Sequence, residues 1–195
     1  MILGLDLSLR AAGLALVPED FAPGLDFSRV RVRTVGEKLP ANATSRQQAE
    51  RIAKIAHAIV VFARNHGVTK AWIENYAFSR GDSRAHALGE LGGVVRVALL
   101  RSGIEFDVVH SNTARKHLGK FSALPKKKRE NKNVEALPPK VKEQVHLALY
   151  GMGAPKHWTG DELDAFVVAN HGLIEGGHGG ILVPEEPKQT KKRAA

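Results

Sequence analysis

The stretch MILGLDLSLRAAGLALV, residues 1–17, contains the strongest structural signal in this chain. Residues 1–7 and 11–17 are short apolar segments with the length of β-strands, and the three residues between them suit a tight turn. The sequence therefore predicts a β-hairpin at the N-terminus. One residue does not fit this pattern, because Asp6 lies inside the first apolar segment and aspartate is a poor strand former.

The segments that follow extend this hairpin into a sheet. Residues 28–35 alternate apolar or small side chains with arginines, which predicts a third antiparallel strand. Residues 69–74 and 105–110 have the composition of two further strands, separated by a segment with helical spacing. Strands that alternate with helices after an antiparallel meander predict a mixed sheet with helices on its faces.

Helical periodicity is clearest after residue 44. Ser45 and Gln48 have the form of a capping box, and apolar residues then recur at helical spacing until His66 and Gly67. Asp82 or Ser83 is expected to cap the next helix. Further helices are expected over residues 83–102, 112–118, 138–150 and 161–173.

Length, charge and composition favour one soluble domain with an anionic partner. The chain has 195 residues, and 29 Lys+Arg against 20 Asp+Glu give a net charge of +9. Such basic proteins favour nucleic acid or an anionic membrane surface. No apolar run approaches the roughly 18 residues that span a bilayer, and Asp6 interrupts the apolar N-terminus, so we expect a cytoplasmic protein that does not enter the membrane.

Four acidic residues lie in otherwise apolar surroundings: Asp6, Glu74, Asp161 and Asp164. An unpaired carboxylate is costly to bury. Individually, Asp6 can form a turn, Glu74 can be the first exposed residue after a strand, and Asp161 can complement a helix dipole. These explanations fit Asp164 less well, because it lies between Leu163 and a further apolar run.

Together, the acids and the basic charge indicate metal-dependent cleavage of phosphodiesters. Asp161 and Asp164 are three residues apart and so share one helix face. Two-metal hydrolysis uses carboxylates that bind Mg²⁺ or Mn²⁺ ions about 3.5–4 Å apart. The chain has no cysteine, so any metal ligands must be oxygen or imidazole. HExxH, Walker A and zinc-finger spacings are absent, which leaves those chemistries without support.

The ordered set of motifs resembles the RuvC family of Holliday junction resolvases, within the RNase H-like superfamily. The matching pieces are GLDLSLRAAGLAL, WIEN, LGELGGVVR, HSNTARKHLGK and DELDA. The resemblance covers residues 1–175 and implies an RNase H-like α/β fold. That fold has a five-stranded mixed sheet, made of an antiparallel three-strand meander and two parallel strands, with helices on both faces. The implied catalytic residues, and ligands to two Mg²⁺ or Mn²⁺ ions, are Asp6, Glu74, Asp161 and Asp164.

The resemblance also implies a substrate and an assembly. Members of the family act as homodimers that place two active sites on a four-way DNA junction and make paired symmetric nicks during DNA recombination and repair. In the family an aromatic residue shortly after the glutamate helps to open the junction. Here Ala77 stands at the position that the spacing suggests, with Tyr76 and Phe78 beside it.

A basic insertion over residues 119–133 and a Gly/Pro-rich basic tail over 176–195 depart from a compact domain. Charge runs are often solvated surface, but phosphate contacts would supply affinity and salt dependence. Arg115 and Lys116 are favoured over the loop because a short helix places them next to the expected site. The candidate DNA-binding residues are Tyr76, Phe78, Arg80, Arg115, Lys116, Lys120, Lys126, Lys127, Lys128 and Arg129.

Other functions remain compatible with this sequence. An RNase H-like nuclease could act on flaps, RNA–DNA hybrids or other branched DNA, and a catalytically silent protein could bind junctions without cutting them. The first hairpin also resembles the phosphate-binding hairpin of actin-like ATPases, although 195 residues leave no room for their second domain. His157, shortly before DELDA, is a further candidate to polarise a water or contact phosphate.

Overall fold

The computed structural model describes residues 1–21, 26–75, 85–118 and 141–181. A five-stranded mixed sheet forms its centre, in the order β3-β2-β1-β4-β5. Antiparallel pairing joins β1 to β2 and β2 to β3, whereas β1, β4 and β5 are parallel. The expected meander with two added parallel strands is confirmed. The strands are β1 (Ile2–Asp6), β2 (Ala12–Val17), β3 (Arg31–Val35), β4 (Lys70–Asn75) and β5 (Glu105–His110).

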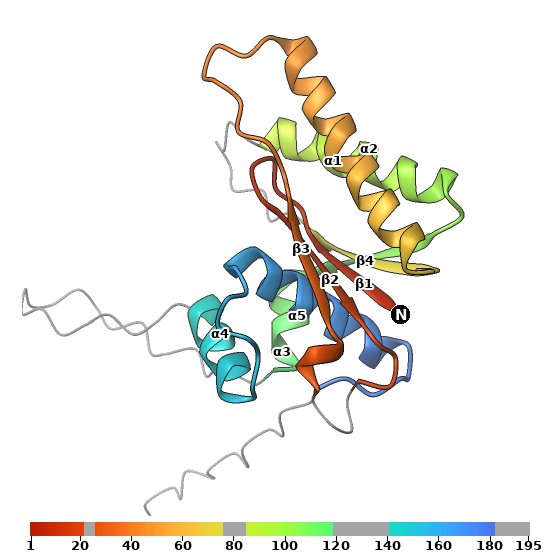
Figure 1. Cartoon of the computed structure of the whole chain (residues 1–195), viewed down its shortest axis with the longest axis vertical. Coiled ribbons are helices and arrows are strands. Elements are labelled where there is room, and N and C mark those ends of the chain that lie inside the picture. Colours follow the sequence, from red (N-terminus) through yellow and green to blue (C-terminus); the bar gives the residue numbers. More distant parts are fainter. Residues whose placement is uncertain (22–25, 76–84, 119–140, 182–195) are drawn as a thin grey trace, which may run out of the picture.

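Helices cover both faces of this sheet, as Figure 1 shows. The first pair, α1 (Ser45–Asn65) and α2 (Ala85–Arg101), pack against each other on one face. On the other face, α5 (Gly160–Glu175) lies across β1 and β2 and is contacted by the two remaining helices. These are α3 (Ser111–Lys116) and α4 (Val141–Gly151). Within the described ranges, none of the helices combines the length and apolar character that a bilayer span requires.

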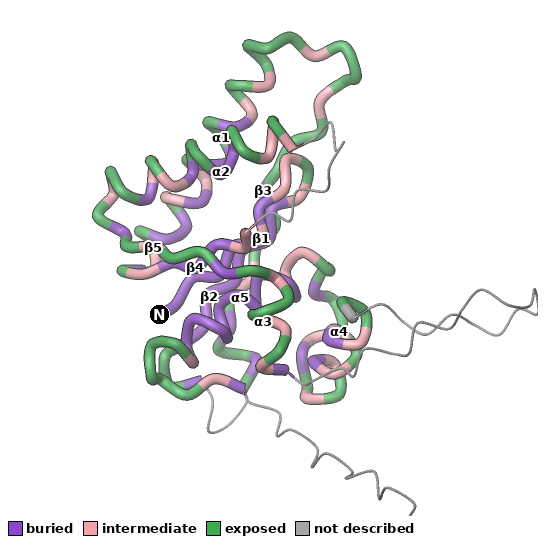
Figure 2. The backbone as a smooth tube through the Cα atoms, turned by 180° about the vertical axis from the view of Figure 1, so that it is seen from behind, coloured by how far each residue is buried: buried purple, intermediate pink, exposed green. Residues whose placement is uncertain are grey.

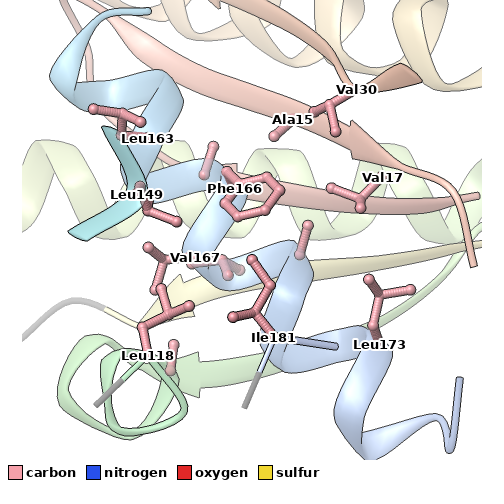
Figure 3. Close-up of a cluster of buried hydrophobic side chains, with 14 of the residues drawn as sticks. Ala15, Val17, Val30, Leu118, Leu149, Leu163, Phe166, Val167, Leu173 and Ile181 are labelled. Atoms are coloured by element: carbon pink, nitrogen blue, oxygen red, sulfur yellow. The ribbon is translucent and has the colours of Figure 1, made fainter. Parts of the chain in front are cut away.

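Two hydrophobic clusters follow from the alternation of side chains along the strands. Leu3 and Leu5 of β1 belong to the cluster under α1 and α2, whereas Ile2 belongs to the cluster under α5. Buried residues are concentrated in β1, β2 and α5 (Figure 2). Phe166 lies among the side chains of the α5 cluster (Figure 3), so α5 is an internal element of the fold.

Two glycines allow α5 to lie directly on the sheet. A Cβ at Gly4 would be 2.0 Å from the carbonyl oxygen of Ala165, and a Cβ at Gly13 would be 2.0 Å from that of Asp161. Both contacts are with backbone atoms that cannot rotate away, so only glycine fits at this separation. Gly13 is also the partner of Asp6 in the β1–β2 pairing. The first turn of α5 is therefore placed over the end of β1.

The expected starts of α1 and β3 are wrong, by one residue and by three residues. The capping box of α1 is formed by Thr44 and Gln47, because Thr44 has the extended backbone of an N-cap and its side chain accepts from the Gln47 amide. Ser45 is instead the first helical residue. The third strand begins at Arg31, because Phe27–Arg29 forms a 3₁₀ turn that the Asp26 side chain caps.

Several other expectations lie outside the described residues. These are the cap at Asp82 or Ser83, the basic insertion over residues 119–133, and residues 182–195 of the expected tail over 176–195.

Candidate active site

The fold brings together the four acidic residues that the sequence singles out. Leu5 pairs with Ile73 in the parallel β1–β4 ladder, so Asp6 and Glu74 follow side by side. Both face α5, since Leu5 and Ile73 point into the opposite cluster. Asp161 and Asp164 come from the first turns of α5, and the charges of both act on Asp6. Glu74 and Asp6 also share a side-chain hydrogen bond.

Local sequence explains how α5 presents its two aspartates. Thr159 is the N-cap of α5, and its side chain forms a reciprocal capping box with Glu162. The acidic first turn is favourable at the positive end of the helix dipole. Asp164 lies one turn further along, on the face that packs inward, and is only 2% exposed. The dipole thus accounts for Asp161 and Glu162, but not for a buried carboxylate at position 164.

Crowding of carboxylates makes this site rich in negative charge. Burial, together with the charges of Glu74 and Asp164, raises the pKa of Asp6 from 3.8 to about 8. Burial likewise raises the pKa of Glu74, against the opposing effect of Arg115. Near neutral pH, Asp6 therefore keeps a proton that it can donate to Glu74. A proton at this position indicates a place where a bound cation would be stabilised.

Asp164 behaves differently because three basic side chains surround it. Lys142 forms an ion pair with Asp164, His146 Nε2 lies 3.1 Å from its Oδ1, and Arg115 Nη2 lies 3.3 Å from the same oxygen. Burial would raise the pKa of Asp164, but the hydrogen bonds from His146 and Lys142 outweigh it and hold the pKa below its usual value. Arg115 also approaches Glu74, at 3.8 Å. The site is thus an acidic centre partly neutralised by the protein's own cations.

Comparison with known proteins gives a clear result for the fold. The chain matches no known family model and no curated protein sequence. Among solved structures it is similar to Thermus thermophilus RuvC in complex with a Holliday junction substrate, with a TM-score of 0.62 and 17% identity over 93% of this chain and 98% of that one. A second structure of Thermus thermophilus RuvC matches with a TM-score of 0.60, 17% identity, and coverage of 93% and 99%.

This chain has the RuvC fold. The yeast mitochondrial Holliday junction resolvase Ydc2 is also similar, with a TM-score of 0.53 and 12% identity over 91% of this chain and 79% of that one. The resemblance noted from the motifs is therefore confirmed at the level of the fold.

Within this RuvC fold, two residues of the site are not among the sequence candidates. Lys142 and His146 reach Asp164 from α4. They are four residues apart on a predicted helix and so share one face, which is the only signal that could have indicated them. His157, in contrast, is exposed.

Of the candidate DNA-binding residues, Arg115 and Lys116 lie in the part of the RuvC fold that the structure describes. Lys116 is exposed, whereas the Arg115 side chain is 15% exposed and engaged with acids. The remaining candidates lie outside the described residues: Tyr76, Phe78, Arg80, Lys120, Lys126, Lys127, Lys128 and Arg129.

The raised pKa of Asp6 predicts how the metal-free protein responds to pH. Because the folded state holds a proton that the unfolded state releases near pH 3.8, the contribution of Asp6 to stability is lost as pH rises towards about 8. The free energy of unfolding, measured with urea in the presence of a chelator, should therefore include a component that decreases between these two pH values. Asp6→Asn should remove it. An identical pH profile for both proteins would contradict the buried, protonated state of Asp6.

Proposed function

We propose that this protein is a metal-dependent, structure-selective endonuclease that resolves four-way DNA junctions by paired symmetric nicks. The observation that carries the proposal is the arrangement of Glu74, Asp161 and Asp164, from two further elements, around Asp6 of β1, whose pKa all three raise. The net charge of +9 favours a polyanionic substrate. The RuvC fold, present in a solved structure with a Holliday junction substrate, makes a four-way junction the substrate to test first.

The donor set fits a hard divalent cation. All four side chains offer carboxylate oxygens, and the charges of the other three add to burial in raising the pKa of Asp6, so a divalent cation among them would be stabilised. The residues that would hold Mg²⁺ or Mn²⁺ are therefore Asp6, Glu74, Asp161 and Asp164. A pair of such ions supplies an activated water and neutralises the leaving oxygen.

The basic side chains near the acids, Lys142 and Arg115, have a second role in this proposal besides neutralising charge. Lys142 is half-exposed, so its ammonium can leave Asp164 and contact a phosphate when DNA approaches. Arg115 is more enclosed and connects Glu74 with Asp164, which keeps the two carboxylates in a fixed relation. Asp6 must release its proton before it can bind a cation, so activity should increase as pH rises towards the pKa of about 8.

A homodimer would place two such sites on one junction. The outer face of α2 supports this assembly, because Val94, Val97 and Leu100 are exposed by 41%, 48% and 71%. Their spacing of three residues puts them along one side of the helix. Sedimentation equilibrium of the full chain would test the dimer, and a monomer at the concentrations that cut DNA would contradict it.

Lys116 is the described residue best placed for a phosphate contact next to the site. It is exposed at the end of α3, beside the engaged Arg115. We expect Lys116→Ala to weaken junction binding and to reduce the slope of log Kd against log salt by about 1. Lys54→Ala is the matched control. Lys54 lies on α1, across the sheet from the site, and pairs there with Glu37. An unchanged salt slope for Lys116→Ala would count against this contact.

The test of the function compares substrates under one set of conditions. The protein is incubated with Mg²⁺ or Mn²⁺ and a labelled four-way junction, with linear duplex, a flap and an RNA–DNA hybrid as parallel substrates. Symmetric paired nicks on the junction alone are expected. Equal cleavage of the flap or the hybrid would identify a different RNase H-like nuclease, and binding without cleavage would identify a junction-binding protein. Stabilisation by ATP would instead support the ATPase alternative.

A further inference from the structure

A second cluster of potential metal ligands lies at the far end of α5. His171 and Glu175 are one helical turn apart on α5, and His117 directly follows α3. One ligand atom from each lies within 4.8 Å of the other two. We propose that His117, His171 and Glu175 bind a transition-metal ion of the zinc class.

The geometry needs only a small adjustment to accept such an ion. His117 Nε2 and His171 Nδ1 are 2.9 Å apart, and their rings are stacked with an interplanar angle of 29°. In a tetrahedral zinc site, Zn–N distances of about 2.0–2.1 Å separate neighbouring ligand atoms by roughly 3.4 Å. The two imidazoles would therefore move apart by about half an ångström. Glu175 is exposed, so its carboxylate can rotate into place, and solvent can supply the fourth ligand.

A simple hydrogen bond between two histidines is the competing explanation. It accounts for the short nitrogen–nitrogen distance but not for a carboxylate at the same point. His171 is also held firmly, since it is 5% exposed and packs edge-on against Trp72 at 4.8 Å between ring centroids. This packing presents a preorganised imidazole of His171 to the imidazole of His117, and the helix spacing places the Glu175 carboxylate within reach of both.

This site is separate from the acidic centre. His171 follows Asp164 by roughly two turns of α5, which corresponds to about 10 Å along the helix axis. Its ligand set also differs, because two imidazoles favour zinc-class ions whereas an all-carboxylate set favours Mg²⁺ or Mn²⁺. The inference therefore does not depend on the proposed nuclease function.

An ion at this position would act as a structural clamp. It would join the end of α3 to α5, and α3 also carries Arg115, which contacts Glu74 and Asp164. The bound metal would thus hold Arg115 in place without contacting the substrate.

Zinc binding to the full chain tests the proposal directly. Chelator-treated protein is dialysed against ZnCl₂ with excess Mg²⁺, followed by metal analysis and thermal melts. We expect one zinc per chain and a rise in Tm of several degrees. His117→Ala and Glu175→Gln should each lower the zinc affinity by at least about tenfold. Bound Co²⁺ should show the visible absorption of a tetrahedral site in the wild type but not in these variants.

Two controls make the outcome decisive. Asp161→Asn disables the acidic centre and should retain zinc, and His57→Ala removes an exposed histidine of α1 and should bind as the wild type does. Circular dichroism establishes that each variant is folded. The proposal is overturned if the wild type binds no zinc, if Asp161→Asn loses it, or if folded His117→Ala and Glu175→Gln bind zinc as tightly as the wild type.

Discussion

Asp6→Asn should reduce junction cleavage by about 10³-fold or more while leaving junction binding nearly unchanged. The charges of Glu74, Asp161 and Asp164 all raise the pKa of Asp6, which places Asp6 among the other three acids. An amide in its place can still donate a hydrogen bond to Glu74, but it is a poor ligand for Mg²⁺ compared with a carboxylate. The several kcal/mol of transition-state stabilisation that bound metal supplies would be lost. Single-turnover cleavage and a binding titration on the same labelled junction measure the two quantities.

The matched control for this variant is Asp107→Asn. Asp107 is a half-exposed acid of β5 that pairs with Lys70 at 2.9 Å, away from the acidic centre, so its loss should leave cleavage within about twofold. Cleavage retained by Asp6→Asn in Mg²⁺ would remove Asp6 from the metal site. A parallel loss of binding and cleavage would instead assign Asp6 a role in folding or in DNA contact.

Gly13→Ala should slow cleavage by about 10²-fold, because a shift of about 1 Å at a catalytic centre has an effect of this size. The added Cβ would meet the carbonyl carbon of Asp161 at 2.3 Å and its oxygen at 2.0 Å. The first turn of α5 must therefore move away from β2, and it takes Asp161 and Asp164 with it. We also expect a loss of about 1–3 kcal/mol in the free energy of unfolding, as for other overpacked positions.

Gly151→Ala is the matched control for Gly13→Ala. It makes the same chemical change at the end of α4, where an added Cβ meets no described atom within 4 Å. Single-turnover rates and urea unfolding curves of the two variants should therefore differ. Wild-type cleavage by Gly13→Ala, with unchanged stability, would mean that α5 is not held in place by this contact.

Much of the architecture could be predicted because it depends on short-range patterns. The two apolar segments around residues 8–10 form β1 and β2 as expected, and the alternating arginines mark β3. Asp6, Glu74 and Asp164 stand out in the sequence because charged residues in apolar runs conflict with local preference. Conflicts of this kind arise mainly where a functional site requires them, so the sequence alone indicates these acids.

The rest depends on tertiary contacts that no local pattern encodes. Lys142 and His146 contact Asp164 because α4 packs on α5. No pattern in the sequence between residues 119 and 140 predicts where α4 packs. The expected cap of α1 is wrong by one residue because Thr44 and Ser45 are both good N-caps with a glutamine three residues later. No local pattern predicts the contact between His117 and His171, since 54 residues separate them in the sequence.

The basic side chains around Asp164 imply that this protein can fold before it has acquired any metal. Small zinc domains remain unfolded without their ion because metal binding supplies the free energy of their folding. Here Lys142, Arg115 and His146 already surround the most buried acid. A newly made chain could therefore reach its native shape wherever free divalent ions are scarce. Binding of divalent ions would then be a late and reversible step. It would depend on the concentration of these ions near the DNA and not on how the chain folded.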